Sequence, residues 1–160
     1  MTELRTGIGY DLHPYAAGRP LVLGGVTVDY VRGLAGHSDG DALSHAVADA
    51  LLGAAGLGDL GEWFPPGDPR YRDAHSLGLL EQVVRALHER GWGVVNCDAV
   101  VVAQVPRLAP YRAAMRANLA RALGVGEERV NVKATAPERL GALGRAEGVA
   151  ALATVLIERE

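Results

Sequence analysis

The sequence predicts an α+β fold in which helices pack on one face of a mixed β-sheet. Segments with the pattern of strands are interleaved with segments that have the pattern of helices along the 160 residues, which favours a layered architecture. The opening strands follow one another without a helix between them, so the chain is not a strict β-α-β protein. No internal repeat, linker or low-complexity tract interrupts it. Its length is typical of one domain with its own core, and we expect residues 1–160 to form a single domain.

The first third of the chain is expected to form strands and then a helix. Residues 5–13 alternate loosely between apolar and polar and predict a strand. Residues 21–28 predict one or two short strands around a Gly-Gly turn. A helix is expected over residues 38–55, because Ser38 and Asp41 resemble a capping box at its start and a glycine follows its last residue.

The rest of the chain begins with an irregular stretch, residues 57–74. A loop of this length in a compact domain is more often functional than not. Residues 138–148 predict a turn-rich connector. Amphipathic or Pro-started segments that end at glycine predict helices, and Val-rich segments predict strands. These elements are helices over 76–90 and 110–123 and strands over 94–104, 129–135 and 149–158.

Composition excludes several classes of protein. The net charge is -3, and no basic stripe or aromatic platform indicates a nucleic-acid partner. No apolar run approaches the roughly 20 residues of a membrane span, and the N-terminus lacks a signal sequence. The single cysteine, Cys97, excludes an internal disulfide and fits a reducing compartment. We therefore expect a cytoplasmic protein that binds neither nucleic acid nor membranes.

Asp11, His13 and His45 are the candidate metal ligands. Asp11 and His13 are two residues apart in a predicted strand and so project from the same face. His45 lies in the predicted helix. Two imidazoles and one carboxylate form the ligand set of a catalytic zinc site with an open fourth position. Either histidine alone is more often an ordinary structural residue, but their combination with Asp11 favours a metal.

The helix that carries His45 also offers two carboxylates. Asp41, His45 and Asp49 lie at i, i+4 and i+8, which places them on one helix face. A metal-bound histidine normally donates its second ring N–H to a carboxylate or a carbonyl. We expect Asp41 or Asp49 to be that acceptor. Helix capping is the simpler role for Asp41, and the two roles can coexist.

His37 and Ser38 lie at the predicted start of the same helix. A helix N-terminus can bind a phosphate, although ordinary capping by Ser38 explains the pattern equally well. The sequence has no nucleophile elbow, phosphate-binding loop, dinucleotide fingerprint or His-Glu-x-x-His motif. A metal site without an evident general base suits a reaction in which the substrate supplies its own nucleophile.

Longer motifs resemble those of one enzyme family over essentially the whole chain. The most specific is His-Ser-Asp-Gly-Asp followed by a histidine four residues later. The motifs are Gly9–His13, His37–Asp41 with His45, Asp49–Ala54, Gly58–Gly61 with Phe64–Pro65, Ala103–Leu108, Asn131–Thr135, Glu138, Leu140–Gly141, Gly144–Arg145 and Glu147–Gly148. The chain resembles the 2-C-methyl-D-erythritol 2,4-cyclodiphosphate synthase family of the non-mevalonate route to isoprenoids.

The resemblance implies a homotrimer with active sites between subunits. It implies zinc on Asp11, His13 and His45, and Mg²⁺ or Mn²⁺ held through Glu138 and the substrate diphosphate. The implied substrate is 4-diphosphocytidyl-2-C-methyl-D-erythritol 2-phosphate, and the products are the cyclic diphosphate and CMP. An isoprenoid diphosphate on the trimer axis, near Arg145 and Glu147, is left open as a further partner.

The resemblance also implies the substrate contacts. His37 and Ser38 would bind phosphates, and Asp59 and Gly61 would bind the methylerythritol hydroxyls. The cytidine pocket would consist of Ala103, Pro106, Arg107, Leu108, Ala134 and Thr135. Leu60, Phe64, Asp68 and Arg145 complete the expected substrate-binding set. The expected catalytic residues are His37, Glu138 and Ala136.

Four positions depart from the family, and at one of them, Arg107 in place of the common Lys, the charge is kept. Ala136 stands where the family often has Thr, so only its backbone N–H is available there. Pro66 replaces a common Asp, and Ala142 replaces a bulkier residue. These departures affect the expected phosphate and methylerythritol contacts and leave the zinc ligands untouched.

Two other functions compete with the synthase. A zinc-dependent hydrolase would use the same three ligands and a metal-bound water, and would give linear products. A non-catalytic metal- or isoprenoid-binding trimer would tolerate the loss of Glu138 and Asp59.

Overall fold

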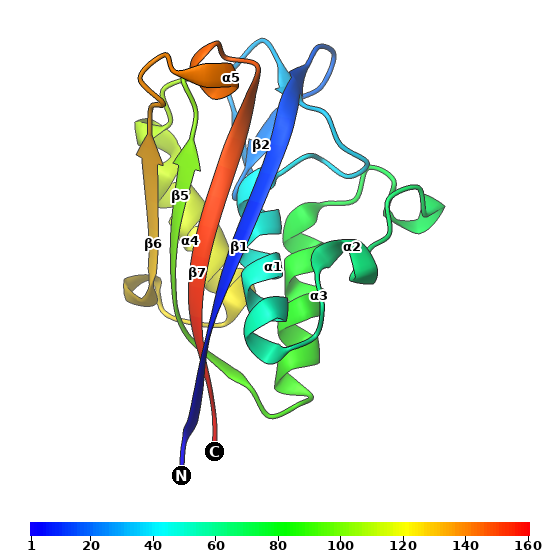
Figure 1. Cartoon of the computed structure of the whole chain (residues 1–160), viewed down its shortest axis with the longest axis vertical. Helices are drawn as coiled ribbons and strands as arrows, with labels where there is room; N and C mark the ends of the chain where they lie inside the picture. The colour runs from blue at the N-terminus through cyan, green and yellow to red at the C-terminus, as the bar shows by residue number, and fades with distance from the viewer.

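A mixed β-sheet forms one layer of the molecule (Figure 1). The computed structural model describes residues 1–160. The strands of the sheet are β1 (Glu3–Ala16), β4 (Gly33–Leu34), β5 (Gly93–Val102), β6 (Val130–Thr135) and β7 (Gly148–Arg159). They lie in the order β4-β1-β7-β5-β6. β5 and β6 are parallel and the other neighbours are antiparallel, which confirms the predicted mixed sheet. A separate hairpin pairs β2 (Leu21–Leu23) with β3 (Val26–Val28).

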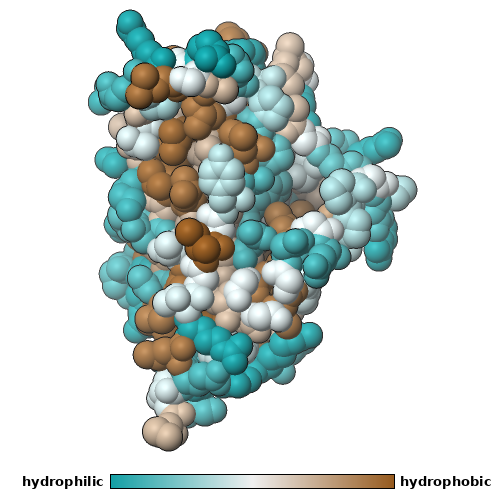
Figure 2. All heavy atoms as spheres, in the orientation of Figure 1, coloured by the Kyte–Doolittle hydropathy of each residue, from teal (hydrophilic) through white to brown (hydrophobic).

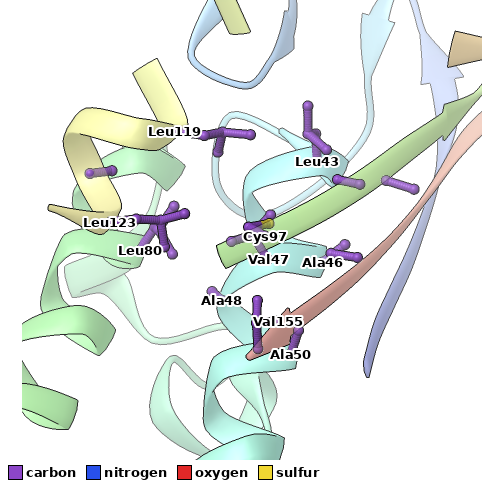
Figure 3. Close-up of a cluster of buried hydrophobic side chains, with 14 of the residues drawn as sticks. Leu43, Ala46, Val47, Ala48, Ala50, Leu80, Cys97, Leu119, Leu123 and Val155 are labelled. Carbon is purple, nitrogen blue, oxygen red and sulfur yellow. The ribbon is translucent and has the colours of Figure 1, made fainter. Parts of the chain in front are cut away.

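Helices form the second layer, on one face of the sheet (Figure 1). The long helices are α1 (Ala42–Ala55), α3 (Ser76–His88) and α4 (Arg112–Leu123). The short ones are α2 (Leu60–Trp63), α5 (Gly141–Gly144) and the 3₁₀ turns Pro69–Tyr71, Ala109–Tyr111 and Glu127–Arg129. A cluster of 36 buried residues fills the space between the layers. Figure 3 shows part of it, with leucines of α3 and α4 facing α1, beside Cys97 and Val155 of the sheet. Burial of this apolar surface stabilises the two-layer arrangement.

The closest contact between the layers joins β1 to α1. Alternate residues of a strand point to opposite faces, and the odd-numbered residues of β1 face the helix. At Gly9 a Cβ atom would lie 1.9 Å from the carbonyl oxygen of Ala46, and at Gly7 it would lie 1.9 Å from that of Ala50. The strand therefore packs directly on the helix backbone. Asp11 and His13 share this face and therefore lie beside the N-terminal half of α1.

The even-numbered residues of β1 point away from the helices. Leu4, Ile8, Tyr10 and Leu12 are 59%, 70%, 56% and 50% exposed. Figure 2 shows hydrophobic side chains gathered over the sheet face that no helix covers. Exposed apolar side chains gathered on one face are typical of an interaction surface.

The element boundaries differ from prediction in places. β1 is longer than residues 5–13, and β4 was not expected. The irregular stretch 57–74 contains α2 and a 3₁₀ turn, and the connector 138–148 contains α5. The helix expected from residue 38 begins at Ala42. Its N-cap is Asp41, because Gly40 has φ +75° and turns the chain just before the helix. No helix combines the length and the apolar character that a membrane crossing needs.

Candidate functional site

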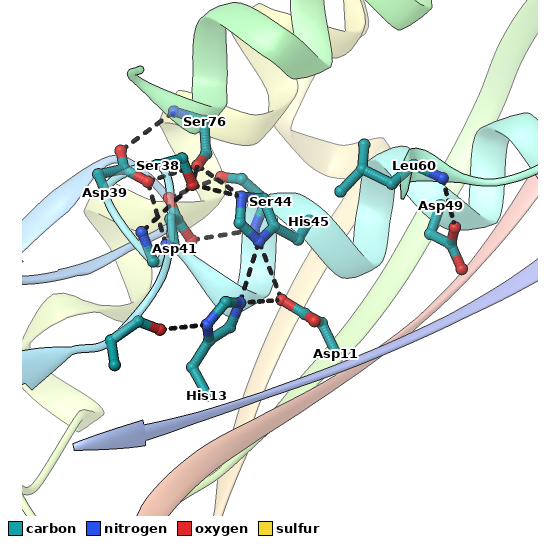
Figure 4. Close-up of polar contacts among 12 residues, drawn as sticks. Asp11, His13, Ser38, Asp39, Asp41, Ser44, His45, Asp49, Leu60 and Ser76 are labelled. Atoms are coloured by element: carbon teal, nitrogen blue, oxygen red, sulfur yellow. Dashed lines mark hydrogen bonds and ion pairs between the residues drawn. The ribbon is translucent and has the colours of Figure 1, made fainter. Parts of the chain in front are cut away.

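Three ligand atoms converge between β1 and α1 (Figure 4). Asp11 Oδ2 lies 2.7 Å from His13 Nε2 and 2.9 Å from His45 Nδ1. The two ring nitrogens are 3.3 Å apart. Ligands of a tetrahedral zinc ion with bonds of about 2.0–2.1 Å lie about 3.3 Å from one another. The three atoms therefore fit one small divalent cation, and together they make the candidate metal site of the structure.

Hydrogen bonds within this cluster shift the pKa values of Asp11 and His13. Burial raises the pKa of the Asp11 carboxyl, but hydrogen bonds from His13 and His45 outweigh burial and hold the pKa well below its usual range. Burial lowers the pKa of His13, yet its bond to Asp11 leaves the net pKa raised. Asp11 therefore remains a carboxylate. A divalent cation would compete with protons for the two imidazoles.

A backbone carbonyl orients the ring of His13. Its Nδ1 lies 2.5 Å from the carbonyl oxygen of Ala35. A carbonyl oxygen can only accept a hydrogen bond, so Nδ1 carries the proton and donates it. Nε2 of His13 therefore faces Asp11 and the metal position, where its lone pair would bind a cation.

The second ring nitrogen of His45 faces hydroxyl groups. Its Nε2 lies 2.7 Å from Ser76 Oγ and 3.1 Å from Ser38 Oγ. The expected carboxylate acceptor is therefore wrong for both candidates. The Asp41 side chain does not contact the His45 ring, because it caps the N-terminus of α1 and accepts from Ser44 N. Asp49 lies one turn too far along α1, and it accepts from the backbone N–H of Leu60 at 3.0 Å.

Asp41 has the simpler of its two expected roles. It is completely buried and caps α1 by accepting from Ser44 N at 3.0 Å and Ser44 Oγ at 2.7 Å. It also accepts from the backbone N–H groups of Gly24 and Gly25, each at 2.8 Å. The carboxylate thus joins the β2–β3 turn to the start of α1 and holds the helix that presents His45.

A cavity of about 210 Å³ opens beside the three ligand atoms. Besides the triad, several of the expected substrate residues line it: His37, Ser38, Leu60, Gly61 and Phe64. Pro66, Tyr71 and Leu79 complete the wall. Tyr71 packs edge-on against Phe64, with ring centroids 5.1 Å apart. Tyr71 and Leu79 were not expected in the site, because neither belongs to a spaced motif.

Two expected contacts lie at the edge of this cavity. Asp59 caps α2 by accepting from Glu62 N at 2.9 Å. The carboxylate of Asp68 pairs with Arg70 at 2.7 Å, and its backbone oxygen lies 2.8 Å from His37 Nε2. Neither side chain lines the cavity.

The remaining expected residues form a second group. They lie at or beyond the C-terminal ends of β5 and β6 and in the connector that follows: Ala103, Pro106, Arg107, Leu108, Ala134, Thr135, Ala136, Glu138 and Arg145. None lines the cavity beside the triad. β7 and β5 lie between β1 and β6, so β6 is about 14 Å from β1 across the sheet. Ala134 and Thr135 at the end of β6 therefore lie far from Asp11 and His13 of the same chain.

Comparison with known proteins places the chain among synthases. The model of the YgbB family matches residues 4–158. The 2-C-methyl-D-erythritol 2,4-cyclodiphosphate synthase of Moorella thermoacetica is 59% identical over 154 residues, which are 96% of this chain and 94% of the relative.

Solved structures agree. The bifunctional IspDF of Campylobacter jejuni superposes with a TM-score of 0.96 at 44% identity over 100% of this chain, which spans 43% of that longer protein. A 2C-methyl-D-erythritol-2,4-cyclodiphosphate synthase in a CDP-bound form superposes with a TM-score of 0.88 at 38% identity, over 96% of this chain and 99% of that one.

Proposed function

The chain belongs to the YgbB family, and we propose that Asp11, His13 and His45 form the metal site of its cyclising reaction. The chain is an enzyme of non-mevalonate isoprenoid biosynthesis. It converts 4-diphosphocytidyl-2-C-methyl-D-erythritol 2-phosphate into 2-C-methyl-D-erythritol 2,4-cyclodiphosphate and CMP. The observation that carries the site assignment is the convergence of three ligand atoms, all within 3.3 Å of one another, at the wall of a cavity.

The reaction needs positioning and charge neutralisation more than covalent help from the protein. An oxygen of the 2-phosphate attacks the β-phosphorus of the same molecule, and the bond from that phosphorus to the CMP phosphate oxygen breaks. Because both partners belong to one substrate, a folded pose removes much of the entropic barrier. The cavity residues supply this pose: His37 and Ser38 would bind phosphate oxygens, while Leu60, Gly61 and Phe64 would enclose the methylerythritol chain.

The proposed metals are zinc on the triad and Mg²⁺ or Mn²⁺ on Glu138. Bound there, they would polarise the β-phosphate and offset charge on the leaving CMP. The two imidazoles and one carboxylate suit zinc and leave a coordination position open. Glu138 is exposed and lies in the second group of residues, beside the proposed cytidine pocket. The backbone N–H of Ala136 would serve where the family often has a Thr hydroxyl.

We further propose that the active site is completed by a neighbouring subunit of a homotrimer. The second group contains the proposed cytidine pocket and Glu138. None of its residues lines the cavity beside the triad, and its β6 residues Ala134 and Thr135 lie about 14 Å across the sheet from β1. An apolar sheet face, with Ile8 and Tyr10 more than half exposed, is available for association with further copies of the chain. Heterologous contacts that close into a ring would bring the second group of one subunit to the triad of the next.

Three smaller parts of the proposal follow from the same assignment. Asp59 would bind a methylerythritol hydroxyl at the cavity edge, and Asp68 would act through His37, which its backbone oxygen contacts. Arg145, paired with Glu147 at 2.6 Å, would lie near the trimer axis. An isoprenoid diphosphate on that axis and a cytoplasmic location stay predictions.

Product analysis tests the proposal. The purified protein, loaded with zinc and Mg²⁺, should release CMP and a cyclic diphosphate from the cytidine substrate, as followed by ³¹P NMR. His45→Ala should abolish both products, whereas His88→Ala, which removes an exposed histidine at the end of α3, should not. Linear products would favour a zinc hydrolase. An inert protein with full metal occupancy would favour a non-catalytic binding role.

A further inference from the structure

His45 is held by a chain of side chains that leads away from the metal position (Figure 4). Its Nε2 lies 2.7 Å from the hydroxyl of Ser76. That hydroxyl in turn makes a short hydrogen bond to Oδ1 of Asp39. Ser76 is 1% exposed and His45 is 8% exposed, so water does not compete for these bonds.

The direction of the protons along this chain follows from the donors available. A carboxylate can only accept, so Ser76 must give its single hydroxyl proton to Asp39. The Ser76 oxygen is then left as an acceptor towards His45. With a cation bound at the triad, Nδ1 of His45 would use its lone pair to bind that cation, and Nε2 would then carry the ring proton and donate it to the Ser76 oxygen.

Asp39 is fixed in this role by backbone groups. Its Oδ2 accepts from Ser76 N at 3.0 Å and its Oδ1 accepts from Asp41 N at 3.1 Å. Its own N–H donates to the carbonyl oxygen of Ala74 at 3.1 Å. The donors to the carboxylate are Asp41 N, Ser76 N and the Ser76 hydroxyl. Because a carboxylate only accepts, the bond between the Ser76 hydroxyl and Asp39 has a single direction.

We propose that Asp39 and Ser76 are positioning residues that set the tautomer and ring orientation of His45 for metal binding. The proposal rests on the assignment of the triad as a metal site. It gives the two histidines equivalent support: a backbone carbonyl fixes His13, and a carboxylate fixes His45 through one hydroxyl. Ser76 is the first residue of α3, so its bond to His45 also links the metal site to α3.

Capping of α3 is the ordinary explanation for the pair, and it accounts for only part of the geometry. A cap requires the bond from Ser76 N to Asp39 Oδ2. It does not require the Ser76 hydroxyl to lie between Asp39 and Nε2 of His45. Ser38 also contacts this nitrogen, at the longer distance of 3.1 Å. Because Ser76 takes the proton of His45, the Ser38 hydroxyl remains available for a phosphate oxygen.

Zinc affinity, measured by chelator competition without substrate, tests the proposal. Ser76→Ala removes the acceptor and should weaken zinc binding about 10–100-fold, the usual cost of losing a bond that orients a metal-bound histidine.

Asp39→Asn should also weaken zinc binding. If the amide oxygen keeps the bond to Ser76 N, the amide NH₂ faces the Ser76 hydroxyl. The hydroxyl proton then turns towards His45 and favours the tautomer with hydrogen on Nδ1.

Ser44→Ala is the matched control. It removes another buried serine hydroxyl, directly before His45, which bonds Asp41 at 2.7 Å and does not contact the His45 ring. Its zinc affinity should stay within about threefold of the wild type, because Ser44 is not bonded to the metal-bound histidine. Equal weakening in all three variants would mean that the helices had merely loosened, and would overturn the proposal. Unchanged affinity in Ser76→Ala and Asp39→Asn would overturn it as well.

NMR of the zinc-loaded wild type gives a test that requires no variant to fold. The proposal predicts a slowly exchanging proton on Nε2 of His45 with a nuclear Overhauser effect to the β protons of Ser76. A proton on Nδ1, or an Nε2 proton without that contact, overturns it. If the wild type bound no zinc, both this inference and the proposed metal site would fail. Unchanged affinity in the variants would remove this inference alone.

Discussion

The backbone of Gly9 in β1 lies directly against the backbone of Ala46 in α1. A Cβ atom at Gly9 would come within 1.9 Å of the Ala46 carbonyl oxygen. Ala46 follows His45, and Asp11 follows Gly9 by two residues on the same strand face. The strand–helix contact therefore sets the distance over which the carboxylate and the imidazole meet.

Gly9→Ala should destabilise the protein by about 3 kcal/mol or more, because neither backbone can move without disturbing the core. Urea unfolding measures the change, and zinc affinity should fall with it. Gly78→Ala is the control: nothing lies within 4 Å of its added methyl group, and α3 contains the residue. That variant should be as stable as the wild type or up to about 1 kcal/mol more stable. Equal stability of Gly9→Ala and the wild type would contradict the packing described here.

Asp41→Ala should lower the free energy of unfolding by about 3 kcal/mol. The substitution leaves the donors of Gly24, Gly25 and Ser44 without their acceptor and removes the cap of α1. Asp29→Ala, an exposed aspartate near the same hairpin, should change stability by less than about 0.5 kcal/mol. Similar denaturation midpoints for the two variants would show that the Asp41 network contributes little.

Cys97 should be unreactive in the folded protein. Burial, with a smaller contribution from the neighbouring Asp98, raises the pKa of its thiol to about 12. The reactive thiolate is therefore scarce in the folded protein at any pH well below that value. A thiol reagent at pH 8 should label the native protein very slowly and the guanidinium-unfolded protein completely. Rapid labelling under native conditions would indicate that the sheet opens readily around β5.

Much of the site was predictable from the ligand chemistry of its side chains and from the two-residue period of a strand. Asp11 and His13 share a strand face because they are two residues apart, and their union with His45 followed from the donor set. The partner of His45 was not predictable in this way. Ser76 lies 31 residues further along the chain, and no periodicity links the start of α3 to α1. The carboxylates at helical spacing were the visible alternative, and both turned out to have other partners.

In the fold as well, elements with a local sequence pattern were predicted, whereas features that depend on distant contacts were not. The long helices and the strands β5, β6 and β7 follow from local pattern and from their glycine stops. The start of α1 was misplaced because Ser38 offers a valid cap, whereas the structure uses Asp41, which also binds the β2–β3 turn. β4 has only two residues and exists through pairing with Tyr15 and Ala16, so it has no local signature.

Mixed trimers test whether active sites are shared between subunits. His45→Ala and Glu138→Ala should each be inactive alone. In a closed heterologous ring, every mixed trimer contains one junction with both an intact triad and an intact second group, so it should have about one third of wild-type activity. Co-expression with two different tags and purification on both isolates these trimers. Inactive mixed trimers of confirmed composition would contradict sharing.

Anomalous diffraction at the zinc edge, from crystals grown with zinc and CDP, tests the central claim most directly. The account predicts one strong peak bonded to Asp11 Oδ2, His13 Nε2 and His45 Nδ1, with a phosphate oxygen of CDP in the fourth position. A peak elsewhere, or an ion at the triad enclosed by four protein ligands, would contradict it.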